Sequence, residues 1–327
     1  MGHQVKVVAL FGGISEMPFK GEITALEASV KIRNLDIAAW KKLAIIVKEF
    51  SPDVVQTNSG DTLKYAVLSK KIFGWNVPLI SRNASEVGQY LKSSFQKRIN
   101  RFFYRNVDSI LSVSNASEED ILTQFPFLKS RTQVIPIGLE EVEVDPFEIK
   151  PTGVKHIVHV GGFSFEKNHE GLLRILKIVA NKSKVHLHLV GDGPLKNKLQ
   201  VRVEEEGLKK KVSFYGFVSN PLSFIKAADV LVLPSIIEGL PGVLLEAMYC
   251  RTPVVAYDVG GISEIVSTET GSLIEKGNEN DFANAVLSIL ENPTQCQVLN
   301  AHKMVLESYM NSMITVRFIE EYKKLVN

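Results

Sequence analysis

Short runs of apolar, often β-branched residues alternate along the chain with longer segments in which apolar residues recur every three or four positions. The first pattern is typical of strands in parallel sheets, and the second of the helices that cross over between such strands. The sequence therefore predicts an α/β protein with parallel sheets. The predicted strands cover residues 5–10, 22–26, 54–57, 78–81, 109–113, 133–137, 156–161, 185–191, 212–215, 230–234, 253–257 and 272–274.

Helical periodicity is clear in residues 36–50, where Leu43 and Val47 share an apolar face while Lys41 and Lys48 point elsewhere. This pattern is typical of a crossover helix packed on a sheet. Further helices are expected from Asn168, from Leu195 and over residues 243–249, and two helices are expected to close the chain.

The periodicity stops between residues 137 and 155, in an acidic segment that contains Pro146 and Pro151. Proline and charge without periodicity are typical of a linker between domains. We therefore expect two similar α/β domains facing a cleft, where ligands favour the carboxyl ends of the strands. The expected parts are residues 1–145, a linker at 146–154, a second domain at 155–308, and a C-terminal helix at 309–327 that packs back on the first domain.

The charge balance adds little, since 38 Lys and Arg stand against 36 Asp and Glu, a formal net charge of +2. Such a balance gives no general attraction to nucleic acid, so no nucleic-acid partner is expected. Two cysteines, Cys250 and Cys296, are too few for a disulfide framework or a cysteine-built metal site, and they suit a reducing compartment. No stretch reaches the ~18 apolar residues of a membrane span. A cytoplasmic protein is therefore expected.

The densest candidate chemistry lies between residues 231 and 264. An apolar strand is followed by a Gly–Leu–Pro–Gly turn at 239–242, which opens a helix whose first turn carries no charge. Such a helix start offers unpaired N–H groups and a positive dipole end, so a phosphate would fit there. Glu238 precedes the turn and Glu246 lies about one helical turn beyond it. We expect both carboxylates to border this anion pocket and to hold sugar hydroxyls on either side of a diphosphate.

Ordinary structural roles are the alternative for these residues. Glu246 would then be a solvated helix residue and Glu238 a capping carboxylate, but Glu246 sits among Leu244, Leu245 and other apolar residues, a poor place for an idle charge. Lys167, in the loop after strand 156–161, would alone be a surface lysine. Near Glu238 it becomes a candidate phosphate counterion. Function is favoured for all three side chains.

Several motifs in fixed order carry a family resemblance. They are the E-x7-E signature in EGLPGVLLEAM from Glu238 to Glu246, VGGFSFEKN at 160–168, VGDGP at 190–194, VSFYGFV at 212–218, ADVLVLPS at 228–235, TPVVA at 252–256 and GGISE at 260–264. By these motifs the chain resembles the retaining family 4 glycosyltransferases, which have the GT-B fold of two Rossmann-like domains. The second half is similar to their nucleotide-sugar domain, and the first half would then be the acceptor side.

The resemblance implies a donor site. Glu238 would bind the donor hexose, Glu246 the ribose hydroxyls and Lys167 the diphosphate, with the base beside Gly216, Phe217 and Val218. The other implied donor-binding residues are Gly161, Gly162, Gly239, Leu240, Pro241, Gly242 and Val243.

The implied activity is metal-independent, retaining transfer of a hexose from a UDP-sugar or GDP-sugar to a saccharide or lipid-linked acceptor in cell-surface polysaccharide synthesis. No cofactor and no metal site are expected, and His156, His159, His186 and His188 are interpreted as sheet residues. Two alternatives remain open. One is a catalytically impaired nucleotide-sugar-binding remnant, and the other is a sugar-nucleotide epimerase, a group that does not use this glutamate pair.

The chain departs from the family pattern at three places. Gly162 stands where many relatives have arginine, and Gln56, Thr57 and Asn58 replace a motif that usually carries histidine. Gln56, Asn58 or Ser59 could hydrogen-bond the same ligand. The start, GHQV, resembles the segment before the family's second strand, so we expect the first strand, its loop and first helix to be absent. The alternative is that residues 5–10, followed by FGG, take their place.

Residues 90–106 interleave five cations with aromatic and apolar side chains. A basic amphipathic helix of this kind can lie on an anionic membrane, and an ordinary crossover helix with a solvated face is the alternative. Lipid-linked acceptors in the family favour peripheral contact with the inner face of the membrane.

Overall fold

We describe the protein from a computed structural model, in which residues 2–12, 19, 21–32, 35–148, 153–292 and 295–326 are described. The chain forms two compact units. Unit 1 comprises Met1–Ser112, Ile121–Gln133 and Ile319–Asn327, and unit 2 comprises Val113–Asp120 and Val134–Phe318. The expected linker at 146–154 lies partly outside the described residues, and the expected domain bounds stay a prediction.

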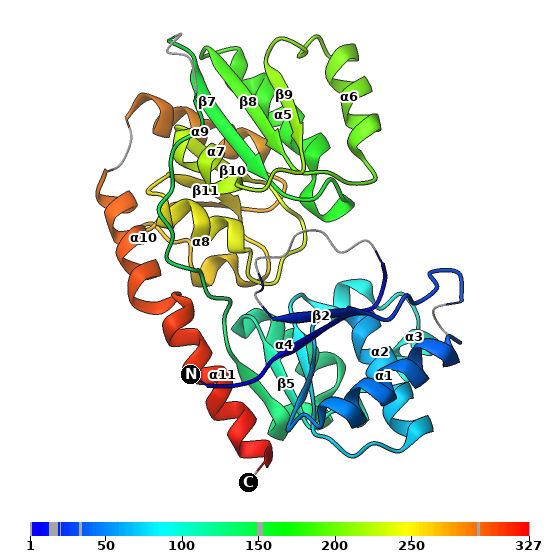
Figure 1. Cartoon of the computed structure of the whole chain (residues 1–327). Helices are drawn as coiled ribbons and strands as arrows, with labels where there is room; N and C mark the ends of the chain where they lie inside the picture. The colour runs from blue at the N-terminus through cyan, green and yellow to red at the C-terminus, as the bar shows by residue number, and fades with distance from the viewer. Residues whose placement is uncertain are drawn as a thin grey trace. The chain divides into compact units, whose positions relative to one another are not determined.

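Unit 2 is built on a six-stranded parallel sheet (Figure 1). Its strands are β7 (Lys155–Val160), β8 (Val185–Val190), β9 (Val212–Gly216), β10 (Val230–Leu233), β11 (Val254–Tyr257) and β12 (Ser272–Ile274). The strand order is β12–β11–β10–β7–β8–β9, so the direction of winding reverses between β10 and β7. In sheets of this type, ligands bind outside the carboxyl ends of the strands at such a reversal.

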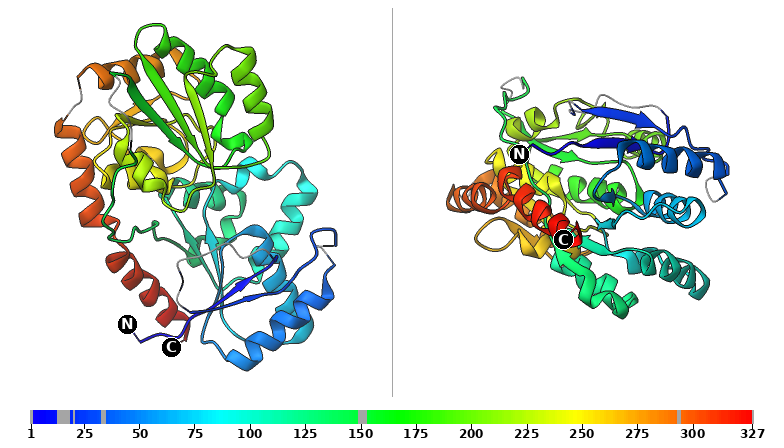
Figure 2. Two further views of the ribbon diagram at one scale, coloured as in Figure 1. Left: turned by 45° about the horizontal axis from the view of Figure 1, so that its top comes forward. Right: turned by 60° about the horizontal axis from the view of Figure 1, so that its bottom comes forward.

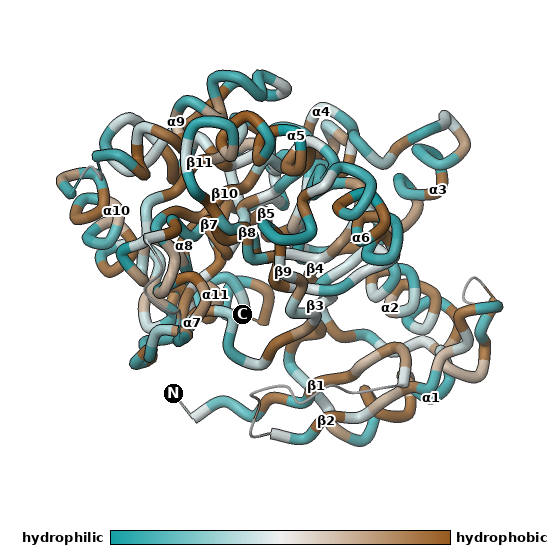
Figure 3. The backbone as a smooth tube through the Cα atoms, turned by 90° about the horizontal axis from the view of Figure 1, so that it is seen from above, coloured by the Kyte–Doolittle hydropathy of each residue, from teal (hydrophilic) through white to brown (hydrophobic). Residues whose placement is uncertain are grey.

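Helices cover both faces of this sheet. The helices of the unit are α5 (His169–Ala180), α6 (Lys196–Glu205), α7 (Pro221–Ala227), α8 (Gly242–Tyr249), α9 (Glu279–Glu291) and α10 (Gln295–Ser308). Helix α5 packs against α9, whereas α8 packs against α7 and α10. Apolar residues concentrate on the strands between them (Figure 3). Burial on both faces explains why these strands are continuous apolar runs, with Val158, Leu187 and Leu231 fully buried.

Three helices close the chain, so the expectation of two was wrong. They are α9, α10 and α11 (Asn311–Val326), and the last two follow each other in orange and red (Figure 2). Helix α9 ends at Glu291, and its C-cap Asn292 is not helical, with φ −139° and ψ 84°. Pro293 follows, and proline disfavours the helical conformation in the residue before it. This break separates two helices that periodicity alone runs together.

Unit 1 contains two separate parallel sheets. Strands β1 (Lys6–Ala9) and β2 (Glu22–Ala25) pair with each other, and β3 (Val55–Thr57), β4 (Leu79–Asn83), β5 (Ser109–Ser112) and β6 (Thr132–Val134) form the second sheet. Figure 3 shows β1 and β2 running as a pair apart from β3 and β4. The helical elements are α1 (Ile37–Phe50), α2 (Gly60–Phe73), η1 (Val87–Tyr90), α3 (Ser94–Arg105) and η2 (Pro126–Arg131), and helix α4 (Asn115–Gln124) has residues in both units.

The topology of unit 1 bears on the start of the chain. Within the described residues, β1 has a ladder only with β2, and β3 has a ladder only with β4. Residues 5–10 therefore do not form a central strand with partners on both sides, as the family's first strand would. Gly13, in the FGG segment that was the alternative to the family's first loop, lies outside the described residues. Two other expectations are corrected. Strand 133–137 ends earlier, at Val134, and the helix expected over 90–106 is shortened to α3, with only Tyr90 of that range in η1.

A chain of hydrogen-bonded histidines crosses the sheet of unit 2. His156 Nδ1 lies 2.9 Å from His188 Nε2, and His188 Nδ1 lies 2.8 Å from the hydroxyl of Tyr215. His186 Nε2 lies 2.8 Å from Ser213 Oγ. Burial first of all, together with the charges of His186 and His156, lowers the pKa of His188 to about 4. These histidines are sheet residues, and they are held in the neutral form.

These neutral, partly buried histidines predict that the folded protein loses stability in acid. An imidazole whose pKa is lower in the folded than in the unfolded protein binds its proton preferentially in the unfolded state, so stability falls as pH drops from about 6.5 toward 4. We expect the wild type to lose more free energy of unfolding between pH 7 and 5 than His188→Gln does, by about 1 to 2 kcal/mol. Urea unfolding at each pH measures this difference. The exposed His3→Gln variant is the control, and identical slopes for all three proteins would contradict the prediction.

Candidate functional site

Two loops meet at the reversal point of unit 2. The loop after β7 contains the short helix η3 (Phe165–Lys167), and the loop after β10 leads into α8. Ile236 N donates to Glu166 O at 2.8 Å, and Asn168 Nδ2 donates to Pro234 O at 3.0 Å. Because these bonds join the two loops, side chains far apart in the sequence come together at the carboxyl edge of β7 and β10.

Lys167 and Glu238 are in direct contact at this edge. Lys167 Nζ lies 2.5 Å from Glu238 Oε1, and the two side chains are 21% and 10% exposed. The sequence predicted that both residues serve one pocket. The ion pair between them is a finding of the structure.

A glycine turn fixes the backbone that carries Glu238. Gly261 N donates to Gly239 O at 2.7 Å. Gly260 has φ +55°, and a Cβ on it would lie 2.1 Å from Glu238 O, so only glycine fits there. Ser114 Oγ also donates to Gly239 O, at 3.3 Å. The position of Glu238 is therefore set by the backbone around it.

The start of helix α8 follows the turn after Glu238 directly in the chain. Its N-cap residue, Pro241, makes no side-chain cap, and the first turn contains no acidic residue. The first amides, those of Gly242 and Val243, thus lie at an uncapped helix N-terminus of the kind that binds phosphate. Leu240 and Pro241, also predicted to bind the donor, are buried in the turn before it.

Glu246 lies in the second turn of α8. Leu244, Leu245, Ala247 and Met248 around it are buried, and burial raises the pKa of the Glu246 carboxyl. In the described part of the chain, this carboxylate receives no hydrogen bond and no ion pair joins it to Lys167. A carboxylate kept half-buried without a partner reduces stability, which points to a ligand.

The remaining predicted residues follow β7 and β9. Gly161 N donates to Val190 O at 3.0 Å, and Gly191 N donates to Gly216 O at 2.8 Å. Gly216 ends β9, Phe217 beyond it is 80% exposed, and Val218 is half-buried. Among the described interactions, no hydrogen bond or ion pair joins these residues to the side chain of Lys167 or Glu238. A Cβ built on Gly161 would lie 3.4 Å from Lys167 Cε, so Gly161 lies beside the lysine side chain.

Gly162 is the position at which the family resemblance led us to expect arginine. A Cβ at this position would have room, since its nearest neighbour would be Asp192 O at 3.7 Å. Sterics therefore do not require glycine here. Lys167 is the cation in contact with Glu238 at this edge.

Two buried histidines beneath the loop were not recognised as part of it from the sequence. His159 Nδ1 lies 2.9 Å from Val232 O, and His159 Nε2 is buried without a partner in the described part of the chain. The ring of His169 lies 4.8 Å from that of His159. Burial lowers the pKa values of His159 and His169 to about 4 and about 2, and the charge of Lys167 contributes in both cases. A histidine two residues before Gly161 was the available signal.

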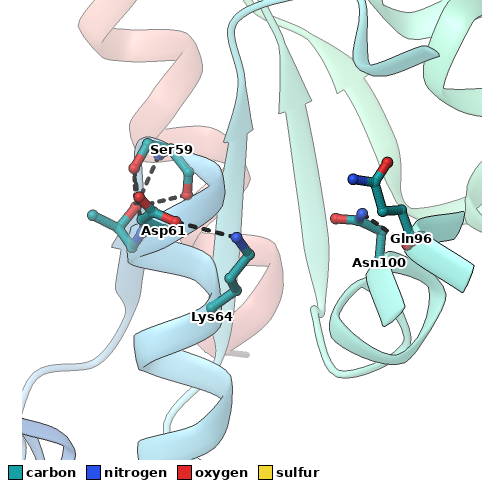
Figure 4. Close-up of polar contacts among 6 residues, drawn as sticks. Ser59, Asp61, Lys64, Gln96 and Asn100 are labelled. Carbon is teal, nitrogen blue, oxygen red and sulfur yellow. Dashed lines mark hydrogen bonds and ion pairs between the residues drawn. The ribbon is translucent and has the colours of Figure 1, made fainter. Parts of the chain in front are cut away.

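The polar residues at the end of β3 and just after it have partners within unit 1. Ser59 and Thr62 form a capping box at the start of α2, next to the 3.1 Å ion pair between Asp61 and Lys64 (Figure 4). Gln56 Nε2 donates to Asn58 Oδ1 at 2.8 Å, and Gln56 Oε1 accepts from Tyr322 at 2.7 Å. All three candidates suggested for ligand contact, Gln56, Asn58 and Ser59, therefore have partners within the unit.

Family models match almost the whole chain. Residues 142–303 match the model of "Glycosyl transferases group 1", and residues 1–141 match that of "Glycosyltransferase Family 4". The chain belongs to the family 4-like glycosyltransferases of the GT-B fold. The predicted α/β fold with two Rossmann-like domains is thereby confirmed.

Solved structures share this fold. Sucrose-phosphate synthase from Thermosynechococcus elongatus matches with a TM-score of 0.84 and 21% identity, over 99% of this chain and 89% of that one. HepE of Anabaena, in complex with UDP-glucose, matches with a TM-score of 0.81 and 19% identity, over 98% of this chain and 100% of that one.

A curated relative is the N-acetylgalactosamine-N,N'-diacetylbacillosaminyl-diphospho-undecaprenol 4-alpha-N-acetylgalactosaminyltransferase of Campylobacter jejuni. It is 28% identical over 69% of this chain and 64% of its own length. The first curated relatives are matched over 58% to 64% of their length.

The buried carboxylate of Glu246 predicts that removing its charge raises the stability of the fold and weakens nucleotide binding. A carboxyl whose pKa is raised in the folded protein stabilises least at high pH, because stability is lost as pH rises from the unfolded value of 4.5 through the raised one. Glu246→Gln should therefore unfold at a higher temperature than wild type at pH 8, with a smaller difference at pH 5. It should also bind UDP about tenfold more weakly, because charged hydrogen bonds to ribose are lost. Thermal unfolding and UDP titration measure both effects.

Glu307→Gln is the matched control, since Glu307 is an exposed helical glutamate. If Glu246→Gln and Glu307→Gln both leave UDP binding unchanged, the ribose assignment is wrong.

Proposed function

We propose that this protein is a retaining, metal-independent glycosyltransferase that transfers a hexose from a UDP-sugar to a saccharide or lipid-linked acceptor in cell-surface polysaccharide synthesis. The observation that carries the proposal is the grouping of Lys167, Glu238 and the uncapped start of α8 at the reversal point of one sheet. The family membership supports the reaction class. The HepE complex supports UDP rather than GDP in the donor, and the name of the Campylobacter relative supports a lipid-linked acceptor.

Each residue of the grouping has a role in this mechanism. Lys167 and the amides of Gly242 and Val243 stabilise the negative charge that develops on the leaving diphosphate. Glu238 accepts hydrogen bonds from hexose hydroxyls and orients the sugar, and Glu246 accepts those of the ribose. Gly216, Phe217 and Val218 border the base. Because preorganised dipoles and one cation stabilise the leaving group, the reaction as proposed routes no step through a metal.

Product analysis tests the reaction. The protein is incubated with labelled UDP-glucose, UDP-galactose or UDP-N-acetylglucosamine, with EDTA, and with a membrane lipid extract or oligosaccharides as acceptors. We expect a labelled glycoside whose anomeric configuration matches that of the donor. Donor binding without product would identify a binding remnant, and a changed sugar on the nucleotide without any acceptor would identify an epimerase.

A variant of Lys167 tests the diphosphate assignment. A lysine that acts as a phosphate counterion contributes to the binding of UDP but not of uridine. We expect Lys167→Ala to weaken UDP about 10- to 100-fold and to leave uridine unchanged. Calorimetric titration of both ligands measures this, with the exposed Lys198→Ala variant as the control. Equal weakening of UDP and uridine would show that Lys167 is structural.

Helix α3 supports the proposal of peripheral contact with the cytoplasmic face of a membrane. Its side chains Phe95, Ile99 and Phe102, spaced one turn apart, are 70%, 38% and 47% exposed, whereas Phe103 and Tyr104 are buried. On the same helix, Asn100 Nδ2 donates to Gln96 O at 3.0 Å (Figure 4). The segment from Lys92 to Asn106 has five cations and no acidic residue. An exposed apolar stripe with flanking cations fits the surface of an anionic bilayer. No described helix is long and apolar enough to span a bilayer.

Vesicle sedimentation tests this contact. We expect the protein to bind vesicles with 30% anionic phosphatidylglycerol and not vesicles of neutral phosphatidylcholine, because each cation near such a surface adds about 1 kcal/mol. The double variant Phe95→Ser, Phe102→Ser should lose most of this binding and keep its UDP affinity. Ile72→Ser, Phe73→Ser changes other exposed apolar residues and is the control. Unchanged vesicle binding of the α3 variant would exclude α3 as the contact.

A further inference from the structure

The contact between Lys167 and Glu238 places two proposed roles in competition. Lys167 is expected to meet a diphosphate, yet its ammonium is bonded to Glu238 Oε1 at 2.5 Å. Glu238 is expected to meet a hexose, and its carboxylate is 10% exposed. An anion that takes the ammonium therefore takes it away from a carboxylate that has little access to water.

We propose that this ion pair makes the site select a nucleoside diphosphate sugar over the free nucleoside diphosphate, so that it promotes release of the nucleotide product. The inference rests on the proposed function, since it assumes the donor class. It concerns the affinity of the site for the nucleotide-sugar donor relative to its affinity for the nucleoside diphosphate product. The roles proposed above for single residues do not determine this ratio.

Binding of the free nucleoside diphosphate is penalised by this arrangement. When the diphosphate attracts Lys167, the Glu238 carboxylate loses its cation while it remains almost buried and close to a new negative charge. Removing one partner from a buried ion pair is strongly unfavourable, because the remaining charge is neither solvated nor paired. The backbone that carries Glu238 is held in place, since its carbonyl oxygen is packed against Gly260 and the next carbonyl, that of Gly239, accepts from Gly261.

A bound hexose removes the penalty. Its hydroxyl groups donate hydrogen bonds to Glu238 and replace those lost from Lys167, so both members of the former pair have a partner. After transfer, the hexose leaves with the acceptor and Glu238 again lacks a partner. Re-formation of the Lys167–Glu238 bond then competes with the diphosphate and favours its release.

The Glu238→Gln variant separates this inference from a simple sugar-binding role. Glutamine has the size of glutamate but no charge, so it neither requires Lys167 nor repels the diphosphate. We expect the variant to bind UDP about tenfold more tightly than wild type and its UDP-sugar about tenfold more weakly. A residue that only binds sugar would leave UDP affinity unchanged. UDP, UDP-glucose, UDP-galactose and UDP-N-acetylglucosamine are titrated into both proteins by calorimetry, without acceptor.

Glu204→Gln is the control, because Glu204 forms an exposed ion pair with Lys209 in the same unit. Its affinities should equal those of wild type. If the wild type binds neither UDP nor any of the three UDP-sugars, the proposed donor class is wrong and the inference fails with it. If the wild type binds them but Glu238→Gln leaves UDP affinity unchanged or lowers it, only the inference is overturned.

A measurement on the wild type does not depend on the folding of a variant. UDP is titrated in the presence of 50 mM glucose, galactose or N-acetylglucosamine. We expect at least one of these hexoses to tighten UDP binding several-fold, because a free hexose can supply hydroxyls to Glu238, and binding free energies are coupled reciprocally. Unchanged UDP affinity with all three sugars would overturn the inference.

Discussion

The bond between Lys167 and Glu238 is possible because the sheet of unit 2 reverses its winding between β7 and β10. These strands are neighbours in the sheet but lie about seventy residues apart in the chain, at Lys155–Val160 and Val230–Leu233. Parallel neighbours end at the same edge, so the loops that follow them meet there. The hydrogen bond from Ile236 N to Glu166 O then brings the cation of one loop to the carboxylate of the other.

The titratable side chains at this edge lie in surroundings that disfavour their charged forms or offer them few partners. Glu238 has one cation as partner, Glu246 has a carboxyl pKa raised by burial, and His159 and His169 are kept neutral beneath the loop. Sites that bind charged ligands commonly carry such unfavourable groups, because the ligand supplies the missing partner. The rest of the unit, with its fully buried strands, provides the stability that permits this.

The sequence predicted much of this architecture because local patterns determine it. Strand β12 (Ser272–Ile274) was predicted residue for residue, and the loop residues Lys167 and Glu238 were assigned to one pocket from their places after apolar runs. The ion pair itself could not be predicted, since it depends on the register of β7 against β10 and on two long-range hydrogen bonds. The break between α9 and α10 was missed although Pro293 marked it. The separation of β1 from β3 concerns which strands pair, a property that periodicity does not encode.

Hydrogen exchange with saturating UDP tests most directly whether the reversal point of unit 2 is the donor site. The account predicts slower amide exchange in residues 161–168 and 236–246 when UDP is present, because these loops and the start of α8 surround the diphosphate and ribose. Exchange in β1, β2 and α3 should be unchanged. Protection confined to unit 1, for example around the hollow lined by Lys71, Trp75 and Arg131, or no protection at saturating UDP, would contradict the account.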